Sequence, residues 1–224
     1  NTTTSTSPTT VSTQAKASVS LKGQLITVKT DVVSAVINTV GGTIESIKLL
    51  KYPQKLGEKN KPVVLLNNNA NTRYLAQSGL IVNGRHVPIL FQAANLHYQL
   101  NPSQSQLTVH LIWRNSQGIQ ITKNLVFSRN KYAVKINYDI NNTGDQIWHG
   151  ELYNQLSRTN PKKAGGFLHY TTFIGAAIST PEEHYQKYKF SSLDDTDINQ
   201  IVKGGWVAMI QHYFISAIIP PANK

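Results

Sequence analysis

The chain has 224 residues, of which 40% are hydrophobic and 15% are charged. This much apolar surface excludes a wholly disordered chain, and the scarcity of charged residues disfavours a helical bundle. The absence of cysteine excludes disulfides, thiolate nucleophiles and Cys-ligated zinc. A net charge of +11 suits an anionic partner, which could be nucleic acid, a lipid headgroup or an acidic protein.

The N-terminal residues differ in composition from the rest of the chain. Residues 1–18 include eleven Ser or Thr and only Val11, Ala15 and Ala17 as aliphatic residues. Such a segment has too little apolar surface to pack, so it is predicted to be a disordered linker. Residues 19–224 are predicted to form one folded domain. No run approaches the ~18 apolar residues that a membrane-spanning helix needs.

Short runs rich in β-branched residues, separated by turn residues, predict strands along the chain. The clearest signal is the alternation of apolar and polar residues in 107–113 and 132–140, which is typical of a strand with one buried face. Between residues 51 and 62, lysines, prolines and a glycine predict a solvated loop. The predicted strands are 24–29, 32–39, 43–50, 63–66, 107–113, 119–127, 132–140, 206–210 and 213–219.

Two local features lead to more specific predictions. Thr180, Pro181 and Glu183 form a capping-box pattern, which predicts a short helix over residues 180–188 that stabilises the fold. Gly204 and Gly205 precede Trp206, and the apolar run that follows predicts a strand buried on both faces. The competing interpretation makes Trp206 an exposed contact residue for a sugar or a partner.

The sequence contains no motif for common catalytic or cofactor chemistry. The seven histidines show no metal-ligand spacing, and residues 195–206 lack the glycine and the glutamate of a calcium loop. Phosphate loops, dinucleotide fingerprints and the Gly-x-Ser-x-Gly elbow are also absent. No metal, cofactor or catalytic residue is therefore assigned. Nucleic acid is not expected as a partner, because only the charge supports it.

Several segments together resemble the large periplasmic domain of the YidC family of bacterial membrane insertases. The similarity runs in order from about residue 24 to residue 220. The segments that carry it are Lys29-Thr30-Asp31-Val32, Asn38-Thr39-Val40-Gly41-Gly42, Gln77-Ser78-Gly79-Leu80, Gly175-Ala176-Ala177, Ser179-Thr180-Pro181-Glu182-Glu183 and Lys203-Gly204-Gly205-Trp206-Val207-Ala208-Met209.

This resemblance implies a fold and a location. The expected fold is an all-β, mainly antiparallel β-supersandwich that is galactose-mutarotase-like and has one or more short helices. The expected location is the periplasmic side of the Gram-negative inner membrane, with the protein anchored in the membrane at full length. Family domains continue beyond the position of Pro220, so this domain is expected to be truncated at its C-terminus.

The resemblance also implies a function. A non-catalytic domain is expected to support membrane protein insertion through contacts with SecDF, the Sec translocon or nascent membrane proteins. Because the chain is basic, anionic lipid headgroups are a further expected partner. The family's SecDF-contacting region corresponds to the segment from Lys135 to Pro181. The candidate partner-binding residues in it are Tyr153, Gln155, Arg158, His169 and Tyr170.

Two alternatives remain open. The domain could be a passive spacer with no specific partner. It could also be a carbohydrate-binding or mutarotase-like protein, since the implied fold occurs in such proteins and Trp113, Trp148 and Trp206 could stack on sugars. Mutarotation needs an acid and a base that converge on one ring, and the candidates are His149, Glu151 and His169.

Overall fold

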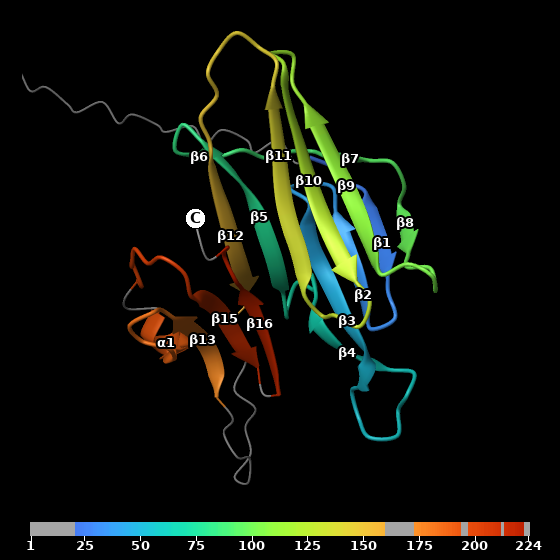
Figure 1. Cartoon of the computed structure of the whole chain (residues 1–224). Coiled ribbons are helices and arrows are strands. Elements are labelled where there is room, and N and C mark those ends of the chain that lie inside the picture. The colour runs from blue at the N-terminus through green and yellow to red at the C-terminus, as the bar shows by residue number, and fades with distance from the viewer. Residues whose placement is uncertain (1–20, 160–172, 194–196, 212, 222–224) are drawn as a thin grey trace, which may run out of the picture.

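A computed structural model of the chain describes residues 21–159, 173–193, 197–211 and 213–221 (Figure 1). These residues form three β-sheets and one helix, α1 (Phe190–Leu193). All pairs between named strands are antiparallel except β1 with β8, which confirms the all-β, mainly antiparallel prediction. The relationship to galactose mutarotases stays a prediction. The predicted linker, residues 1–18, lies outside the described residues.

The large sheet has eight strands. Its main order is β12-β5-β3-β2-β1-β8, so β12 lies at one edge; β4 pairs with β3, and β6 with β5. The strands are β1 (Leu25–Lys29), β2 (Val33–Asn38), β3 (Thr43–Pro53), β4 (Pro62–Leu66), β5 (Tyr74–Val82), β6 (Arg85–His86), β8 (His97–Gln99) and β12 (Glu151–Arg158).

Two four-stranded sheets accompany the large sheet. The facing sheet has the order β11-β10-β9-β7, and Figure 1 shows it in front of the large sheet. The C-terminal sheet has the order β14-β13-β15-β16. Their strands are β7 (Gln92–Ala93), β9 (Gln106–Arg114), β10 (Ile119–Ser128), β11 (Val134–Asn142), β13 (Ile174–Ser179), β14 (Gln186–Lys189), β15 (Trp206–Gln211) and β16 (Phe214–Ile218).

The core lies between the large sheet and the facing sheet. Burial alternates residue by residue along β2 and β10, as expected for strands with one covered face. Ile26 and Ile37 of the large sheet and Leu111 and Leu125 of the facing sheet are fully buried in the same apolar cluster. The predicted strands of residues 24–66 and 107–140 are confirmed, with boundaries that shift by up to three residues.

One position of this core carries an ionisable side chain. The alternation along β10 turns Lys123 inward, where its side chain is completely buried. Its Nζ donates hydrogen bonds to the carbonyls of Gly41 and Gly42, both at 2.9 Å, and of Ser78 at 3.1 Å. Nζ also lies 5.5 Å from the centre of the Tyr138 ring. Burial lowers the pKa of Lys123 to about 7 and raises that of Tyr138 to about 12.

Replacing Lys123 with Met tests this contact. The apolar chain fills a similar volume, but it leaves three carbonyls without their donor, so we expect the free energy of unfolding to fall by about 3 kcal/mol. Urea denaturation measures the loss. Lys48→Met, on the exposed side of β3, is the control and should change the free energy by less than about 0.5 kcal/mol. Equal stability of the two variants would contradict the structural role of Lys123.

The predicted helix at residues 180–188 is wrong. The Thr180 Oγ1 does accept a hydrogen bond from the Glu183 N–H at 2.9 Å, as a capping box requires. The Thr180 N–H, however, donates to the Glu183 carbonyl, which closes a turn. Residues 186–189 then form β14 and pair with β13, so strand pairing overrides the local helix signal. Tyr185 is 55% exposed and does not pack beneath a helix.

The strand predicted at Trp206 is confirmed as β15, but its burial on both faces is wrong. Val207 is 44% exposed, and Trp206 is only partly buried. The Trp206 ring lies 6.3 Å from that of Tyr185. The two preceding glycines adopt positive φ angles of 82° and 88°, as the turn prediction requires.

These two glycines differ in the space around them. A Cβ on Gly204 would meet nothing within 4 Å, whereas a Cβ on Gly205 would collide with the Ser179 carbonyl. We expect Gly204→Ala to cost about 1 kcal/mol from backbone strain alone. Gly205→Ala should cost more than about 3 kcal/mol, because backbone atoms must move as well. Thermal melting of both variants checks this, and an equal loss would show that the close approach is unimportant.

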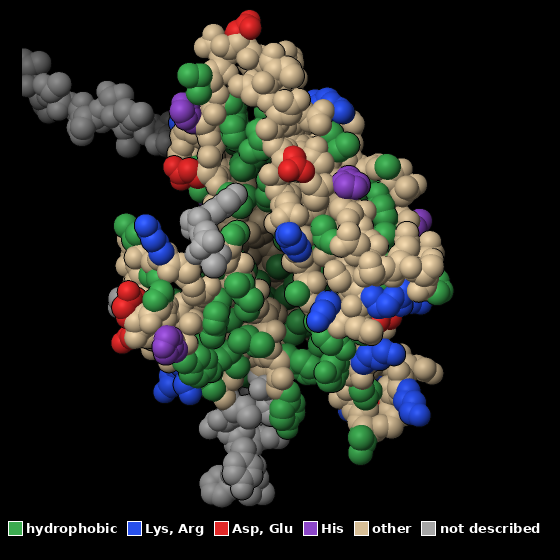
Figure 2. All heavy atoms as spheres, in the orientation of Figure 1, with side chains coloured by type: hydrophobic (Ala, Val, Ile, Leu, Met, Phe, Trp, Pro, Cys, Tyr) green, Lys and Arg blue, Asp and Glu red, His purple; other side chains and the backbone are tan. Residues whose placement is uncertain are grey.

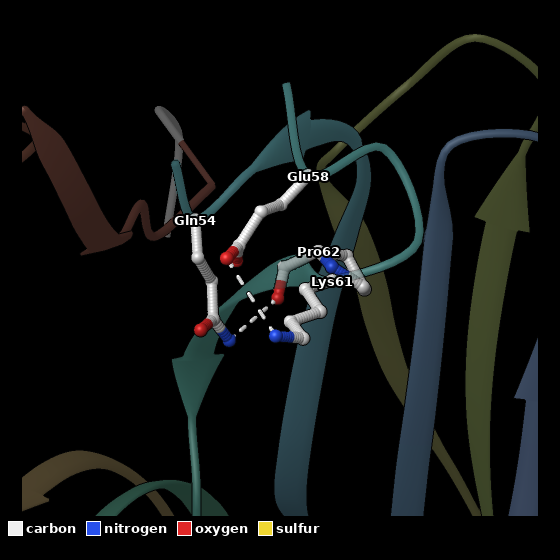
Figure 3. Close-up of polar contacts among 4 residues, drawn as sticks. All are labelled: Gln54, Glu58, Lys61 and Pro62. Atoms are coloured by element: carbon white, nitrogen blue, oxygen red, sulfur yellow. Dashed lines mark hydrogen bonds and ion pairs between the residues drawn. The ribbon is translucent and has the colours of Figure 1, made fainter. Parts of the chain in front are cut away.

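The lysine-rich loop projects from the end of β3 and β4 (Figure 1). The Gln54 Nε2 donates a hydrogen bond to the Pro62 carbonyl at 3.0 Å, and Lys61 forms an ion pair with Glu58 at 3.6 Å (Figure 3). The hydrogen bond closes the base of the loop, and the ion pair lies within it. Leu56 is fully exposed, in agreement with the predicted solvated loop, but residues 51–53 extend β3 and Pro62 begins β4, so the loop is shorter than predicted. Within the described ranges, the structure has no helix long and apolar enough to cross a membrane.

Candidate partner-binding surface

The segment expected to contact SecDF, from Lys135 to Pro181, is divided among all three sheets. Lys135 lies in β11 of the facing sheet, opposite Val126 of β10, and its side chain is exposed. The segment continues through β12 of the large sheet and ends just after β13 of the C-terminal sheet, where Pro181 is exposed. The described parts of the segment do not form a single sheet, so each strand is considered by itself, and the expected SecDF contact stays a prediction.

The candidate partner-binding residues that the structure describes all lie on β12, an edge strand of the large sheet. β12 pairs with β5 over its whole length, from Glu151 opposite Ile81 to Arg158 opposite Tyr74. Its other edge pairs with no described strand. An edge strand has backbone groups that no strand of its own sheet pairs, and among the described residues β16 of the C-terminal sheet lies near part of β12. His169 and Tyr170 lie outside the described residues.

Tyr153 and Gln155 lie on one face of the large sheet, and Arg158 lies on the other, because side chains alternate along a strand. The Tyr153 ring covers Gly79, and a Cβ on Gly79 would come within 2.8 Å of that ring. The Tyr153 ring also meets the His86 ring edge-on, with 4.5 Å between the ring centres. Gln155 is exposed. The three described candidates therefore do not share one face of the sheet. Tyr153 and Gln155 belong to a surface, while Arg158 belongs to a pocket.

The pocket lies between the large sheet and the C-terminal sheet and has a volume of about 550 Å³. β5 and β12 contribute Tyr74 and Arg158, and β15 contributes Gln211. The Gln211 Nε2 donates to the Leu65 carbonyl at 3.3 Å, which joins the two sheets beside the pocket. The Arg158 guanidinium carbon lies 5.1 Å from the centre of the Tyr74 ring, within cation–π range.

Burial changes the acid–base behaviour of this pair. It raises the pKa of the Tyr74 hydroxyl, while the nearby Ser216 hydroxyl and the Arg158 charge act in the opposite direction. Burial also lowers the pKa of Arg158, and Tyr74 opposes this change. An arginine remains protonated even so, so the pocket contains a positive charge that is partly withdrawn from water.

The residues proposed for carbohydrate chemistry are only partly described. His149 precedes β12 by two residues and Glu151 begins it, and both side chains are exposed. His169 lies outside the described residues, so the structure describes only two of the three candidates of this alternative. In the described part of the chain, no three His, Asp or Glu side chains come close enough together to hold a metal ion.

Two important residues, Lys123 and Tyr74, were not among the residues predicted from the sequence. Lys123 occupies an apolar position in the alternation of β10, and a lysine within such a pattern is the available signal for a buried amine. Tyr74 follows an Asn-rich turn and shows no local signal for a pocket. The pocket is formed by segments from β4 to β15, and only their tertiary arrangement brings them together.

The chain matches known proteins over most of its length. The family model described as YidC periplasmic domain matches residues 25–224. The chain is 40% identical over 200 residues to the membrane protein insertase YidC of Coxiella burnetii strain Dugway 5J108-111, covering 89% of this chain and 35% of that protein. The YidC proteins of Legionella pneumophila strain Corby and Nitrosococcus oceani are both 39% identical, over 207 and 205 residues.

These two matches cover 90% and 89% of this chain, and each covers 37% of the relative. The chain therefore spans little more than a third of the length of these curated relatives.

Proposed function

Because this chain belongs to the YidC periplasmic domain family, we propose that it is a non-catalytic accessory domain that supports membrane protein insertion by contacting partner proteins. The family match over residues 25–224 is the observation that carries this proposal. The relatives bear the name of an insertase, but this chain spans only about 35–37% of their length. Insertion itself is proposed to require the remaining parts of such proteins.

SecDF is the proposed partner, alongside the Sec translocon and nascent membrane proteins. The contact surface is the outer face of β12, where Gln155 is exposed and Tyr153 packs on Gly79. The edge of β12 that has no described partner strand adds backbone donors and acceptors to this surface. The proposed location is the periplasmic side of a Gram-negative inner membrane, with anchoring in that membrane at full length.

Site-specific photo-crosslinking tests the partner contact. With a photoreactive residue in place of Gln155, we expect the 224-residue chain to crosslink to purified SecDF in detergent. Gln106, an exposed residue at the start of β9 on the facing sheet, is the control position and should give at least fivefold less product. The crosslinked product is measured by immunoblotting.

Two outcomes would contradict this surface. Equal crosslinking from both positions would indicate a non-specific encounter driven by charge. The absence of crosslinks from position 155, with the folded chain and SecDF both intact, would favour the passive spacer. An exposed residue is used because its replacement leaves the packing of the large sheet unchanged.

Anionic lipid headgroups are a second candidate contact, favoured by the loop between β3 and β4. Leu56 is fully exposed there, and Lys55 and Lys59 beside it are also exposed. Blue and green side chains gather on this projection in Figure 2. Lysines attract an anionic surface, and a leucine can enter the boundary between headgroups and acyl chains.

Vesicle co-sedimentation tests the lipid contact. Leu56→Ser should weaken binding to phosphatidylglycerol-containing vesicles about fivefold, which corresponds to about 1 kcal/mol of lost apolar burial. Ile201→Ser is the matched control, because Ile201 is equally exposed but lies outside the loop. Equal binding by the two variants, or equal binding to neutral vesicles, would contradict this role of the loop.

A further inference from the structure

Two connections from different sheets meet at one end of the molecule, the lower end in Figure 1. The loop segment, 51–61, comprises the end of β3 and the loop before β4, and the turn segment, 129–133, joins β10 to β11. The rings of Tyr52 and Tyr132 connect them, with 5.8 Å between the ring centres. Tyr52 also meets the Phe214 ring of β16 edge-on, again at 5.8 Å. We call the loop segment and the turn segment together the basic tip.

The basic tip has an excess of positive charge. Its loop segment contains four lysines and one acidic residue, and its turn segment contains two basic residues and no acidic one. The acidic residue, Glu58, pairs with Lys61. Asp31 lies beside the turn segment, where it accepts a hydrogen bond from the Asn130 N–H at 3.1 Å. These two carboxylates leave most of the basic side chains without a compensating charge, so the tip attracts anions.

Apolar and aromatic side chains are exposed among these charges. Leu56 is fully exposed, and Tyr52 and Tyr132 are 46% and 44% exposed. A leucine gains free energy when it leaves water, and a tyrosine combines an apolar ring with a hydroxyl that stays hydrated. Leucine, tyrosine and lysine are together typical of surfaces that bind where lipid headgroups meet acyl chains.

A bilayer fits this surface better than other anionic partners do. Nucleic acid or an acidic protein would match the lysines, but either would have to supply an apolar pocket for Leu56. A bilayer has an apolar layer directly beneath its charged headgroups, so it accepts a leucine without a preformed pocket. Because the contact between Tyr52 and Tyr132 holds the two segments together, both can meet one surface.

We propose that the basic tip is a membrane-docking surface, in which the loop segment and the turn segment bind an anionic bilayer together. Leu56 and the two tyrosines enter the headgroup boundary, and the basic side chains contact lipid phosphates. This rests on the lipid contact proposed for the loop and extends it to a second sheet. It also orients the domain: β11 has nine residues, so its other end lies about 30 Å from the docked turn.

Fluorescent labels test this orientation. The chain contains no cysteine, so one introduced cysteine gives one labelled position. An environment-sensitive label is placed at Asn60→Cys in the loop segment, Ala133→Cys in the turn segment, or Gln146→Cys between β11 and β12, all at exposed positions. With phosphatidylglycerol-containing vesicles, we expect the emission of the first two labels to rise at least twofold and that of the third to stay unchanged.

Vesicle co-sedimentation of variants tests the turn segment separately. Tyr132→Ser should weaken binding to these vesicles at least threefold, and Lys131→Gln about fivefold. Tyr185→Ser and Lys203→Gln are the matched controls, because both side chains are exposed and lie outside the basic tip, and they should leave binding unchanged. Lys131→Gln removes only an exposed charge, so it keeps the test decisive if Tyr132→Ser does not fold.

Three results would overturn the proposal. The first is a response of the label at Asn60→Cys without one at Ala133→Cys, which would leave the lipid contact to the loop alone. The second is an equal loss of binding in the tip variants and their controls, which would assign binding to net charge. The third is a loss of binding to single-stranded DNA or polyglutamate in Tyr132→Ser as large as that for vesicles, which would assign the tip to anionic polymers.

The result for Leu56→Ser separates this proposal from the one on which it rests. If Leu56→Ser weakens binding but the turn variants do not, only the docking surface is wrong. If the unaltered chain does not bind phosphatidylglycerol-containing vesicles, the lipid contact of the loop is wrong as well.

Discussion

The amine of Lys123 is the contact on which the arrangement of the two facing sheets depends. It comes from β10 of the facing sheet and binds three carbonyls of the large sheet, in the Gly41–Gly42 turn and in β5. Apolar packing alone has no direction, whereas three hydrogen bonds from one atom fix the position of each acceptor. A Cβ on Gly42 would come within 2.9 Å of the Lys123 side chain, so this turn also requires glycine.

The same contact positions the candidate sites through β5. Ser78 accepts a hydrogen bond from Lys123, and Tyr74 lies four residues earlier on the same face of that strand. β12 pairs with β5 in one continuous register, so the position of β5 also determines that of Arg158 and Gln155. One strand thus connects the buried amine to both the pocket and the outer surface. A change at Lys123 would therefore be expected to affect regions that it does not touch.

The sequence predicts most of the strands because their apolar residues alternate, as in β9 and β10. It predicts the wrong structure at residues 180–188, where the capping hydrogen bond forms but the following residues pair with β13. A local pattern cannot reveal the distant strand that competes with it. The pocket is hidden for the same reason, since Tyr74, Arg158 and Gln211 come from three separate strands. Sequence similarity, in contrast, identifies the family because the match extends over residues 25–224 and so combines many segments.

The net charge of +11 and the single charge of Arg158 act in different ways. Exposed lysines, as in the loop between β3 and β4, attract anions from a distance, but water and salt weaken each contact. Arg158 is partly withdrawn from water and lies on the Tyr74 ring, so a carboxylate that reaches it would interact in a less polar environment. A partly buried ion pair is stabilising only if the remaining hydrogen-bonding groups of both partners are also satisfied.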